Sequence, residues 1–138
     1  MLKRAYEKPT RSDGLRVLVE RLWPRGLSKD AAKIGLWVKA LAPSTELRQW
    51  FHARPGMWRQ FRQRYLEELR ATGAQQPLQQ LYDLLAAGKV FTLIFASRDT
   101  EHNSAVVLKE LLEGARKPPS SSGPAKAASA AMRARARR

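Results

Sequence analysis

The sequence contains no cysteine, and this absence excludes several kinds of site. Without thiols there is no disulfide, no thiolate metal ligand and no cysteine nucleophile. The two histidines, His52 and His102, are far apart in the sequence, so we predict no metal site and no cofactor. A Gly-rich phosphate loop and a Gly-x-Ser-x-Gly elbow are also missing. The sequence therefore names no reaction, and it leaves open whether the protein is an enzyme.

Long apolar runs are missing too. No stretch approaches the ~18 apolar residues of a membrane span, and the N-terminus has no apolar run of signal-peptide length. Together with the lack of cysteine, this predicts a soluble cytoplasmic protein with no membrane partner. No pattern in the sequence indicates an oligomeric state.

Acidic residues are scarce, with 12 Asp and Glu against 26 Lys and Arg, which gives a net charge of +14. Half of this excess lies in residues 116–138, which contain seven bases and no acid, so +7 remains for residues 1–115. The segment 116–138 is rich in Ala, Arg and Lys and cannot bury a core, so we predict a disordered basic tail. The tail is either a solubilising extension or a nonspecific contact with nucleic acid.

Residues 1–115 have the composition and length of one small folded domain. Residues 17–19 and 90–96 are continuous apolar runs of β-favouring residues, as in strands buried on both faces of a parallel sheet. Residues 2–6 predict a short edge strand. Helical patterns separate the two buried runs, so the predicted fold is α/β: a single domain with a mainly parallel sheet flanked by helices.

Capping residues and glycines predict the limits of the helices. A short helix is expected from Ser28 to Lys33. Residues 34–41 fit a strand or the end of a helix about equally, and we favour extended structure there. The next helix begins at Ser44 or Thr45 and ends near His52. The later helices are expected over residues 57–72 with Gly73 as the stop, from Pro77 to Gly88, and from a cap at Asp99 or Thr100 through Ala105, Leu108, Leu111, Leu112 and Ala115.

The helix over residues 57–72 has an aromatic stripe, since Trp58, Phe61, Tyr65 and Leu69 recur at helical spacing. We interpret this stripe as core packing, with base stacking as the alternative. The arginines of the same helix are interpreted as a solvated face, with phosphate contact as the alternative; they are Arg59, Arg62, Arg64 and Arg70.

Both predicted buried strands end in polar clusters, and ligands of parallel α/β sheets bind at the carboxyl ends of strands. A carboxylate and a histidine can move protons, so the candidate catalytic residues are Glu20, Asp99 and His102. Guanidinium groups hold phosphate or carboxylate, and the candidate ligand-binding residues are Arg21, Trp23, Arg25, Arg98 and Asn103. If the two strands are parallel neighbours, these residues meet at one edge of the sheet.

Two functions follow from these observations. The first is binding or processing of an anionic, nucleotide-like small molecule at this edge. The alternative is a nucleic-acid-binding accessory protein that uses its basic surface and tail. Each site residue also has a purely structural interpretation: Asp99 as a helix cap, Glu20 in an ion pair, Trp23 in a packed turn, and His102 and Asn103 as surface or packing residues.

Three blocks of sequence resemble the domain-of-unknown-function 488 family, in its YeaO-like branch. They are RVLVERLWPRGLS at residues 16–28, LWVK at 36–39 with APSTELRQWF at 42–51, and SRDTEHNSAVVL at 97–108. The resemblance spans about residues 2–113 and implies a small cytoplasmic α/β protein whose motifs cluster at one site. The family usually has Asp in place of Glu20, and it often has Ala in place of Ser97, which argues against Ser97 as a nucleophile.

Overall fold

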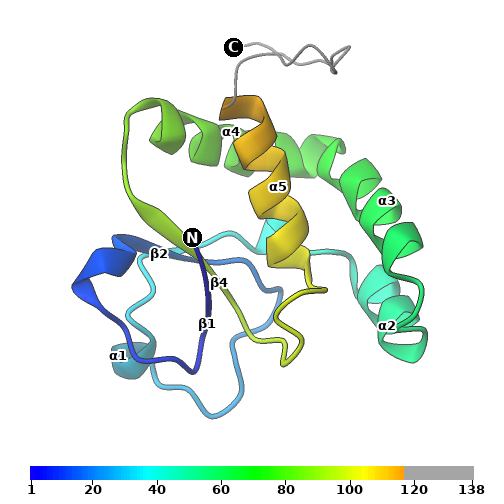
Figure 1. Cartoon of the computed structure of the whole chain (residues 1–138), viewed down its shortest axis with the longest axis horizontal. Helices are drawn as coiled ribbons and strands as arrows, with labels where there is room; N and C mark the ends of the chain where they lie inside the picture. The colour runs from blue at the N-terminus through cyan, green and yellow to red at the C-terminus, as the bar shows by residue number, and fades with distance from the viewer. Residues whose placement is uncertain (117–138) are drawn as a thin grey trace.

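The computed structural model describes residues 1–116 (Figure 1). The predicted basic tail, 116–138, lies outside the described residues except for Arg116, which is the last residue of a helix. Four parallel strands form one sheet in the order β1-β4-β2-β3. The strands are β1 (Leu2–Arg4), β2 (Leu15–Leu18), β3 (Leu36–Trp37) and β4 (Phe91–Phe95). The α/β fold with a parallel sheet is therefore confirmed, and no helix within residues 1–116 is long and apolar enough to cross a membrane.

The two strands predicted to be buried are the central neighbours β2 and β4, paired with Val17 opposite Leu93. All five residues of β4 are buried, because helices cover one face of the sheet and a loop covers the other. The helices are α1 (Lys29–Ala32), α2 (Thr45–Ala53), α3 (Trp58–Leu69), α4 (Thr72–Ala86) and α5 (Ser104–Arg116).

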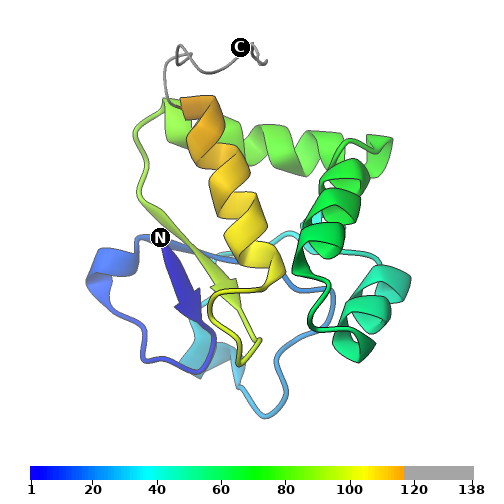
Figure 2. The same cartoon turned by 45° about the vertical axis from the view of Figure 1, so that its right-hand side comes forward.

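Successive residues of β2 point to opposite faces of the sheet. Val17 and Val19 belong to the large core, which is completed by α2 to α5. Leu18 and Ile94 belong to a small second core, which the segment between β2 and β3 closes with Trp23 and Trp37. The chain therefore leaves β2 over one face and leaves β4 over the other. In Figure 2 the yellow-green turn after β4 leads into the yellow and orange helix α5.

A buried ionic cluster lies beside the start of β2, away from the carboxyl ends of the strands. Asp13 is 2% exposed; its carboxylate contacts Arg16 Nη1 at 2.7 Å and Lys3 Nζ at 3.1 Å. It also accepts hydrogen bonds from the backbone N–H and the hydroxyl of Thr10. Burial alone would raise the pKa of Asp13, but these hydrogen bonds outweigh burial and lower the pKa. The cluster ties the first loop to β1 and β2.

Two helix limits differ from the prediction. Gly73 does not end α3, which ends at Leu69, and Pro77 does not begin a helix, since α4 already starts at Thr72. Proline costs an interior helical hydrogen bond, but the buried Ala74, Leu78 and Leu81 follow a helical period that crosses Pro77. Packing of this face against the core therefore keeps the residues before Pro77 helical as well.

The last helix also begins later than predicted. Neither Asp99 nor Thr100 caps α5; the Asn103 side chain does, by accepting a hydrogen bond from Val106 N at 3.0 Å. The prediction for residues 34–41 holds only in part, because β3 has two residues and a 3-10 turn, η2 (Lys39–Leu41), follows it. The aromatic stripe of α3 packs as predicted, with Phe61, Tyr65 and Leu69 buried in the core. Ala105, Leu108 and Leu112 are also buried there, and the side chain of Ala115 lies outside the described ones.

Candidate functional site at the carboxyl ends of β2 and β4

The polar residues after β2 and those after β4 meet, as the sequence predicted. Val19 N donates to Ile94 O at 3.1 Å, which extends the pairing by one residue, and the Glu20 carboxylate then accepts a hydrogen bond from Ala96 N at 3.0 Å. This contact joins the two turns at the point where the chain leaves neighbouring strands over opposite faces. Open α/β sheets bind their ligands at such a point.

Glu20 is held through both its backbone and its side chain. Its backbone carbonyl accepts a hydrogen bond from Trp37 Nε1 at 2.6 Å, and its carboxylate Oε2 accepts from Ala96 N. Within residues 1–116, Oε1 has no hydrogen-bond partner. Burial raises the pKa of the Glu20 carboxyl, against the opposing effects of the Ala96 N–H and the positive charge of Arg48. A half-buried carboxylate with one free oxygen is thus fixed at the centre of the edge.

The charge of this carboxylate acts on Tyr65 of α3. Tyr65 is fully buried, and its hydroxyl donates to the carbonyl of Leu41. Burial raises the pKa of Tyr65, and the negative charges of Glu20 and Glu68 raise it further. The tyrosine is therefore a neutral hydrogen-bond donor to the backbone, with no capacity to exchange protons near neutral pH.

Two of the predicted ligand-binding residues make structural contacts. Arg21 donates to the carbonyls of Pro43 and Ala42, at 3.2 and 3.0 Å, and so fixes the start of α2 against the turn after β2. Trp23 Nε1 donates to Leu27 O, and its ring packs edge-on against Trp37 with centroids 5.4 Å apart. These contacts support the packed-turn interpretation for Trp23, because its indole N–H already has a hydrogen-bond partner. The guanidinium group of Arg21 has its partners in the backbone carbonyls.

Arg25 and Arg98 are different, because both are exposed at the same edge. Neither side chain has an ion-pair or hydrogen-bond partner within residues 1–116. The Arg25 carbonyl accepts from Tyr6 Oη at 2.8 Å, which places this arginine beside the end of β1. Arg98 follows the carbonyls of Ala96 and Ser97, which Arg4 holds through its guanidinium. The edge therefore carries two free guanidinium groups.

The turn before α5 is organised by Asp99. Its Oδ1 accepts from Glu101 N at 2.9 Å and from His102 N at 3.0 Å, and its Oδ2 lies 3.3 Å from His102 Nδ1. These backbone hydrogen bonds lower the pKa of Asp99, which makes it a poor proton acceptor. Asn103 completes the turn, because its Nδ2 donates to Asp99 O while its Oδ1 caps α5.

His102 lies against Trp58, the first residue of α3, with ring centroids 4.9 Å apart. The contact brings α3 to the edge, and the Phe51–Trp58 contact brings α2 with it.

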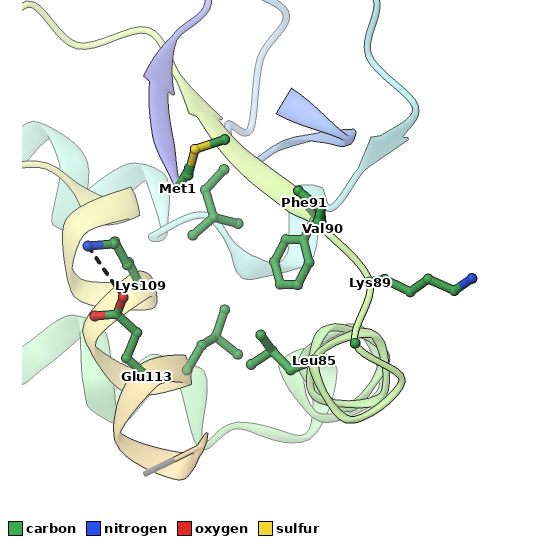
Figure 3. A pocket seen from close by; sticks show the side chains of 10 residues that line it. Met1, Leu85, Lys89, Val90, Phe91, Lys109 and Glu113 are labelled. Carbon is green, nitrogen blue, oxygen red and sulfur yellow. Dashed lines mark ion pairs between the residues drawn. The ribbon is translucent and has the colours of Figure 1, made fainter. Parts of the chain in front are cut away.

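Within residues 1–116, no group of His, Asp and Glu residues is arranged to hold a metal ion. A hollow of about 260 Å³ lies away from these residues, beside the start of β4, where Leu85, Phe91 and Lys109 are among the residues that line it (Figure 3).

Two residues of the edge were missed by sequence reasoning. Arg48 on α2 acts electrostatically on Glu20, and Trp58 supports His102. Arg48 stands in the block 42–51 that carries the family resemblance, so that motif was a usable signal. Trp58 had no such signal, because its helical spacing is that of an ordinary core residue.

Comparison with known proteins places these motifs in a family. The sequence model described as "Inactive DUF488-N3 subclade" matches residues 1–132. The chain belongs to this DUF488 subclade. It is 41% identical over 111 residues to the uncharacterized protein Rv3073c of Mycobacterium tuberculosis, covering 80% of this chain and 91% of that one. It is 40% identical over 110 residues to the uncharacterized protein YeaO of Escherichia coli, covering 80% and 93%. No solved structure matches the chain significantly.

The family assignment confirms the resemblance to the YeaO-like branch. The roles of the individual site residues stay predictions, because none of the relatives is described by a ligand or a reaction. The contacts divide the predicted set into two groups. Arg21, Trp23, Asp99 and Asn103 hold the turns in place. In the second group, Arg25, Arg98 and His102 are exposed and Glu20 is half-buried with one carboxylate oxygen that has no partner within residues 1–116.

Proposed function

We propose that the protein binds a small molecule that carries both an anionic group and an O–H or N–H donor, as a nucleotide does. The ligand would lie at the carboxyl edge of the sheet between β2 and β4. The observation that carries the proposal is the Glu20 carboxylate, half-buried where the two strands diverge, with Oε2 bonded to Ala96 N and Oε1 without a partner in the described chain.

Glu20 would accept the donor group of the ligand. A carboxylate in a partly dry setting costs free energy unless it is hydrogen-bonded, and a hydroxyl or amino group of a ligand supplies the missing bond. Acidic residues near the switch point of nucleotide-binding sheets bind sugar hydroxyls in this way. Glu20 therefore gives the site a preference for ligands that are more than a bare anion.

Arg98 and Arg48 would hold the anionic group. Both side chains are exposed, and neither pairs with a carboxylate within the described residues. A guanidinium binds phosphate or carboxylate through a planar fork of N–H groups. Arg25, beside the end of β1, extends the positive charge along the same edge.

Within this proposal we favour binding without turnover. The matched subclade is described as inactive. Asp99 would be a poor base because its pKa is lowered, and both of its carboxylate oxygens already have partners in the turn. His102 would contact the ligand through the ring nitrogen that does not face Asp99. We retain the expectation of a cytoplasmic protein that takes its ligand from the metabolite pool.

A thermal-shift screen tests the proposal. Nucleoside mono- and diphosphates, sugar phosphates and inorganic phosphate are added to wild type, to Arg98→Gln and to Arg48→Gln, with exposed Arg11→Gln as the charge-matched control. A ligand present at about 100 times its Kd stabilises by about 2.7 kcal/mol, which raises Tm by roughly 5–10 °C in a protein of this size. We expect wild type and the control to respond to at least one organic phosphate more than to phosphate alone.

The two edge variants should lose most of that shift, and Glu20→Gln should reduce the response to the organic phosphate towards that of phosphate alone. Equal responses of all variants to every compound would contradict the proposal. A response to inorganic phosphate that matches the response to the nucleotides would remove the role given to Glu20.

A further inference from the structure

A second basic feature lies on the helical hairpin of α2 and α3. Trp50 on α2 is half-buried and packs against the large core, and its ring carries two guanidinium groups. The Cζ atom of Arg64, on α3, lies 4.3 Å from the ring centroid, and that of Arg54, after α2, lies 5.6 Å from it. We call Arg54, Trp50 and Arg64 the Arg-Trp clamp.

Within residues 1–116, neither arginine of the clamp forms an ion pair. Arg62 of the same hairpin pairs with Glu110 instead. Glu68 is also engaged elsewhere, because its two oxygens accept hydrogen bonds from the backbone N–H and the hydroxyl of Ser44. Two cations thus lie against one indole, and neither is paired with a carboxylate of the described chain.

The indole restrains both guanidinium groups without using their N–H donors. A cation over an aromatic ring gains about 0.5–1 kcal/mol at an exposed site, and a free arginine side chain loses about 2 kcal/mol of rotamer entropy when it is fixed. Part of that ordering has therefore occurred before a partner binds. The donors of both forks stay free for an oxyanion.

The surroundings of the clamp favour a polymer over a single phosphate. Six arginines and two glutamates lie between Arg48 and Arg70, and one glutamate of the two, Glu68, is occupied by Ser44. Arg59, on α3, and Arg70, the residue after its end, are exposed, and one exposed acid, Glu67, lies between them in the sequence. Positive charge is therefore in excess around α3 beyond the two groups of the clamp.

We propose that the α2–α3 hairpin is a docking surface for the phosphodiester backbone of single-stranded nucleic acid, with Arg54 and Arg64 each contacting a phosphate. A flexible single strand can follow the hairpin and bring successive phosphates to it, and such binding is driven by the release of counterions. Trp50 holds the two forks and does not stack with bases, because the guanidinium groups already cover its ring. The proposal does not depend on the small-molecule proposal, because Arg54 and Arg64 are not among the residues assigned to the Glu20 edge.

The test is fluorescence anisotropy of a labelled 20-nucleotide oligothymidylate with the full chain, over a series of salt concentrations. The variant Arg54→Gln/Arg64→Gln removes the clamp charges. One control, Arg137→Gln/Arg138→Gln, removes two charges from the C-terminal segment, and a second, Arg11→Gln/Lys89→Gln, removes two exposed charges elsewhere on the fold. All three variants have the same net charge.

We expect the clamp variant to bind roughly tenfold more weakly at low salt and the slope of log K against log salt to fall by about 1.4, as for two lost phosphate contacts on a single strand. The controls should change affinity by less than about threefold. Arg54→Lys/Arg64→Lys, which keeps the charge and loses the planar fork, should bind several-fold more weakly with an unchanged net charge.

Four results would overturn the proposal: no binding at low salt, equal losses in the clamp variant and either control, wild-type affinity of the lysine variant, or tighter binding of a phosphoserine peptide than of the oligonucleotide. Because the clamp arginines are exposed, their variants should still unfold cooperatively, with Tm lower by no more than several degrees for the loss of two cation–π contacts, and this separates lost binding from lost folding. Arg98→Gln should bind the oligonucleotide like wild type, so the two proposals fail independently.

Discussion

The carboxylate of Glu20 and the backbone N–H of Ala96 lie 3.0 Å apart and join the ends of the two central strands. Burial raises the pKa of the Glu20 carboxyl, and the positive charge of Arg48 acts in the opposite direction. This contact has a structural part, the hydrogen bond, and an electrostatic part, the buried charge. Substitutions can separate the two.

Glu20→Ala removes the acceptor and should cost about 1–3 kcal/mol, because it leaves the Ala96 N–H without its partner. Glu20→Gln keeps an acceptor and should cost less. A folded-state pKa above the unfolded value stabilises the fold below the unfolded pKa, and this stabilisation is lost as pH rises through the folded pKa. The stability of wild type relative to Glu20→Gln should therefore fall as the pH rises above the unfolded pKa of about 4.3, as measured by urea unfolding. The exposed Glu101→Gln serves as control, and the idea fails if both variants have the same pH dependence.

The pH dependence that Asp13 gives to stability has the opposite sign, because the pKa of Asp13 is lowered in the fold. Its contribution is present above the unfolded pKa of about 3.9 and is lost as pH falls towards the folded pKa. Asp13→Asn leaves Lys3 and Arg16 without their counter-charge and should cost about 3 kcal/mol at pH 7. The difference in the free energy of unfolding between wild type and Asp13→Asn should be smaller by about 1 kcal/mol at pH 3 than at pH 7.

The control for Asp13 is Asp83→Asn, an exposed position on α4, which should change the free energy of unfolding by less than about 0.5 kcal/mol. Chemical denaturation at both pH values measures the two gaps. A gap for Asp13→Asn that is equally large at pH 3 and pH 7 would show that the buried charge is not what stabilises this loop.

Gly14, at the start of β2, requires glycine for two reasons. Its φ is +65°, and an added Cβ would lie 2.3 Å from the carbonyl oxygen of Val90. Gly14→Ala should therefore cost more than about 2 kcal/mol. Gly26→Ala has a positive φ of +76° but open space around it, so it should cost only about 1–2 kcal/mol. Gly73→Ala, helical and unobstructed, should be neutral or stabilising by up to about 1 kcal/mol. Thermal unfolding ranks the stability losses of the three variants. If Gly14→Ala is not the most destabilising of them, the role of the Val90 contact is contradicted.

Asn103 should be the cap that α5 depends on. Asn103→Ala removes the acceptor for Val106 N and the donor to Asp99 O, so we expect a loss of about 1–2 kcal/mol. Thr100→Ala, at a position where the sequence predicted a cap, should stay within about 0.5 kcal/mol of wild type. Comparable losses in both variants, measured by urea unfolding, would restore Thr100 as a cap.

Part of the candidate site could be predicted from the sequence, because its signals are local. An apolar run such as 91–95 followed at once by Ser97, Arg98 and Asp99 indicates a buried strand with a polar end, whatever surrounds it. The parallel pairing followed from the helices between the strands, and it brought Glu20 to Ala96. The family resemblance rested on the same residues and is confirmed.

Other features depended on contacts that sequence patterns do not contain. Arg21 and Arg98 look alike in the sequence, yet one holds the carbonyls at the start of α2 and the other is exposed. Pro77 lies inside α4 because Ala74 packs in the core. Asn103 replaced Asp99 as the cap of α5 because the turn before the helix used the Asp99 carboxylate first.

The sequence by itself thus determined which segments are buried strands and helices and which polar residues follow them, because side-chain periodicity and turn chemistry act over a few residues. The tertiary structure decided which guanidinium groups remain free, that Arg48 faces Glu20, and that Arg54 and Arg64 share the ring of Trp50. Those outcomes depend on how helices distant in sequence pack against the sheet, and a side chain's partner is fixed only once that packing has formed.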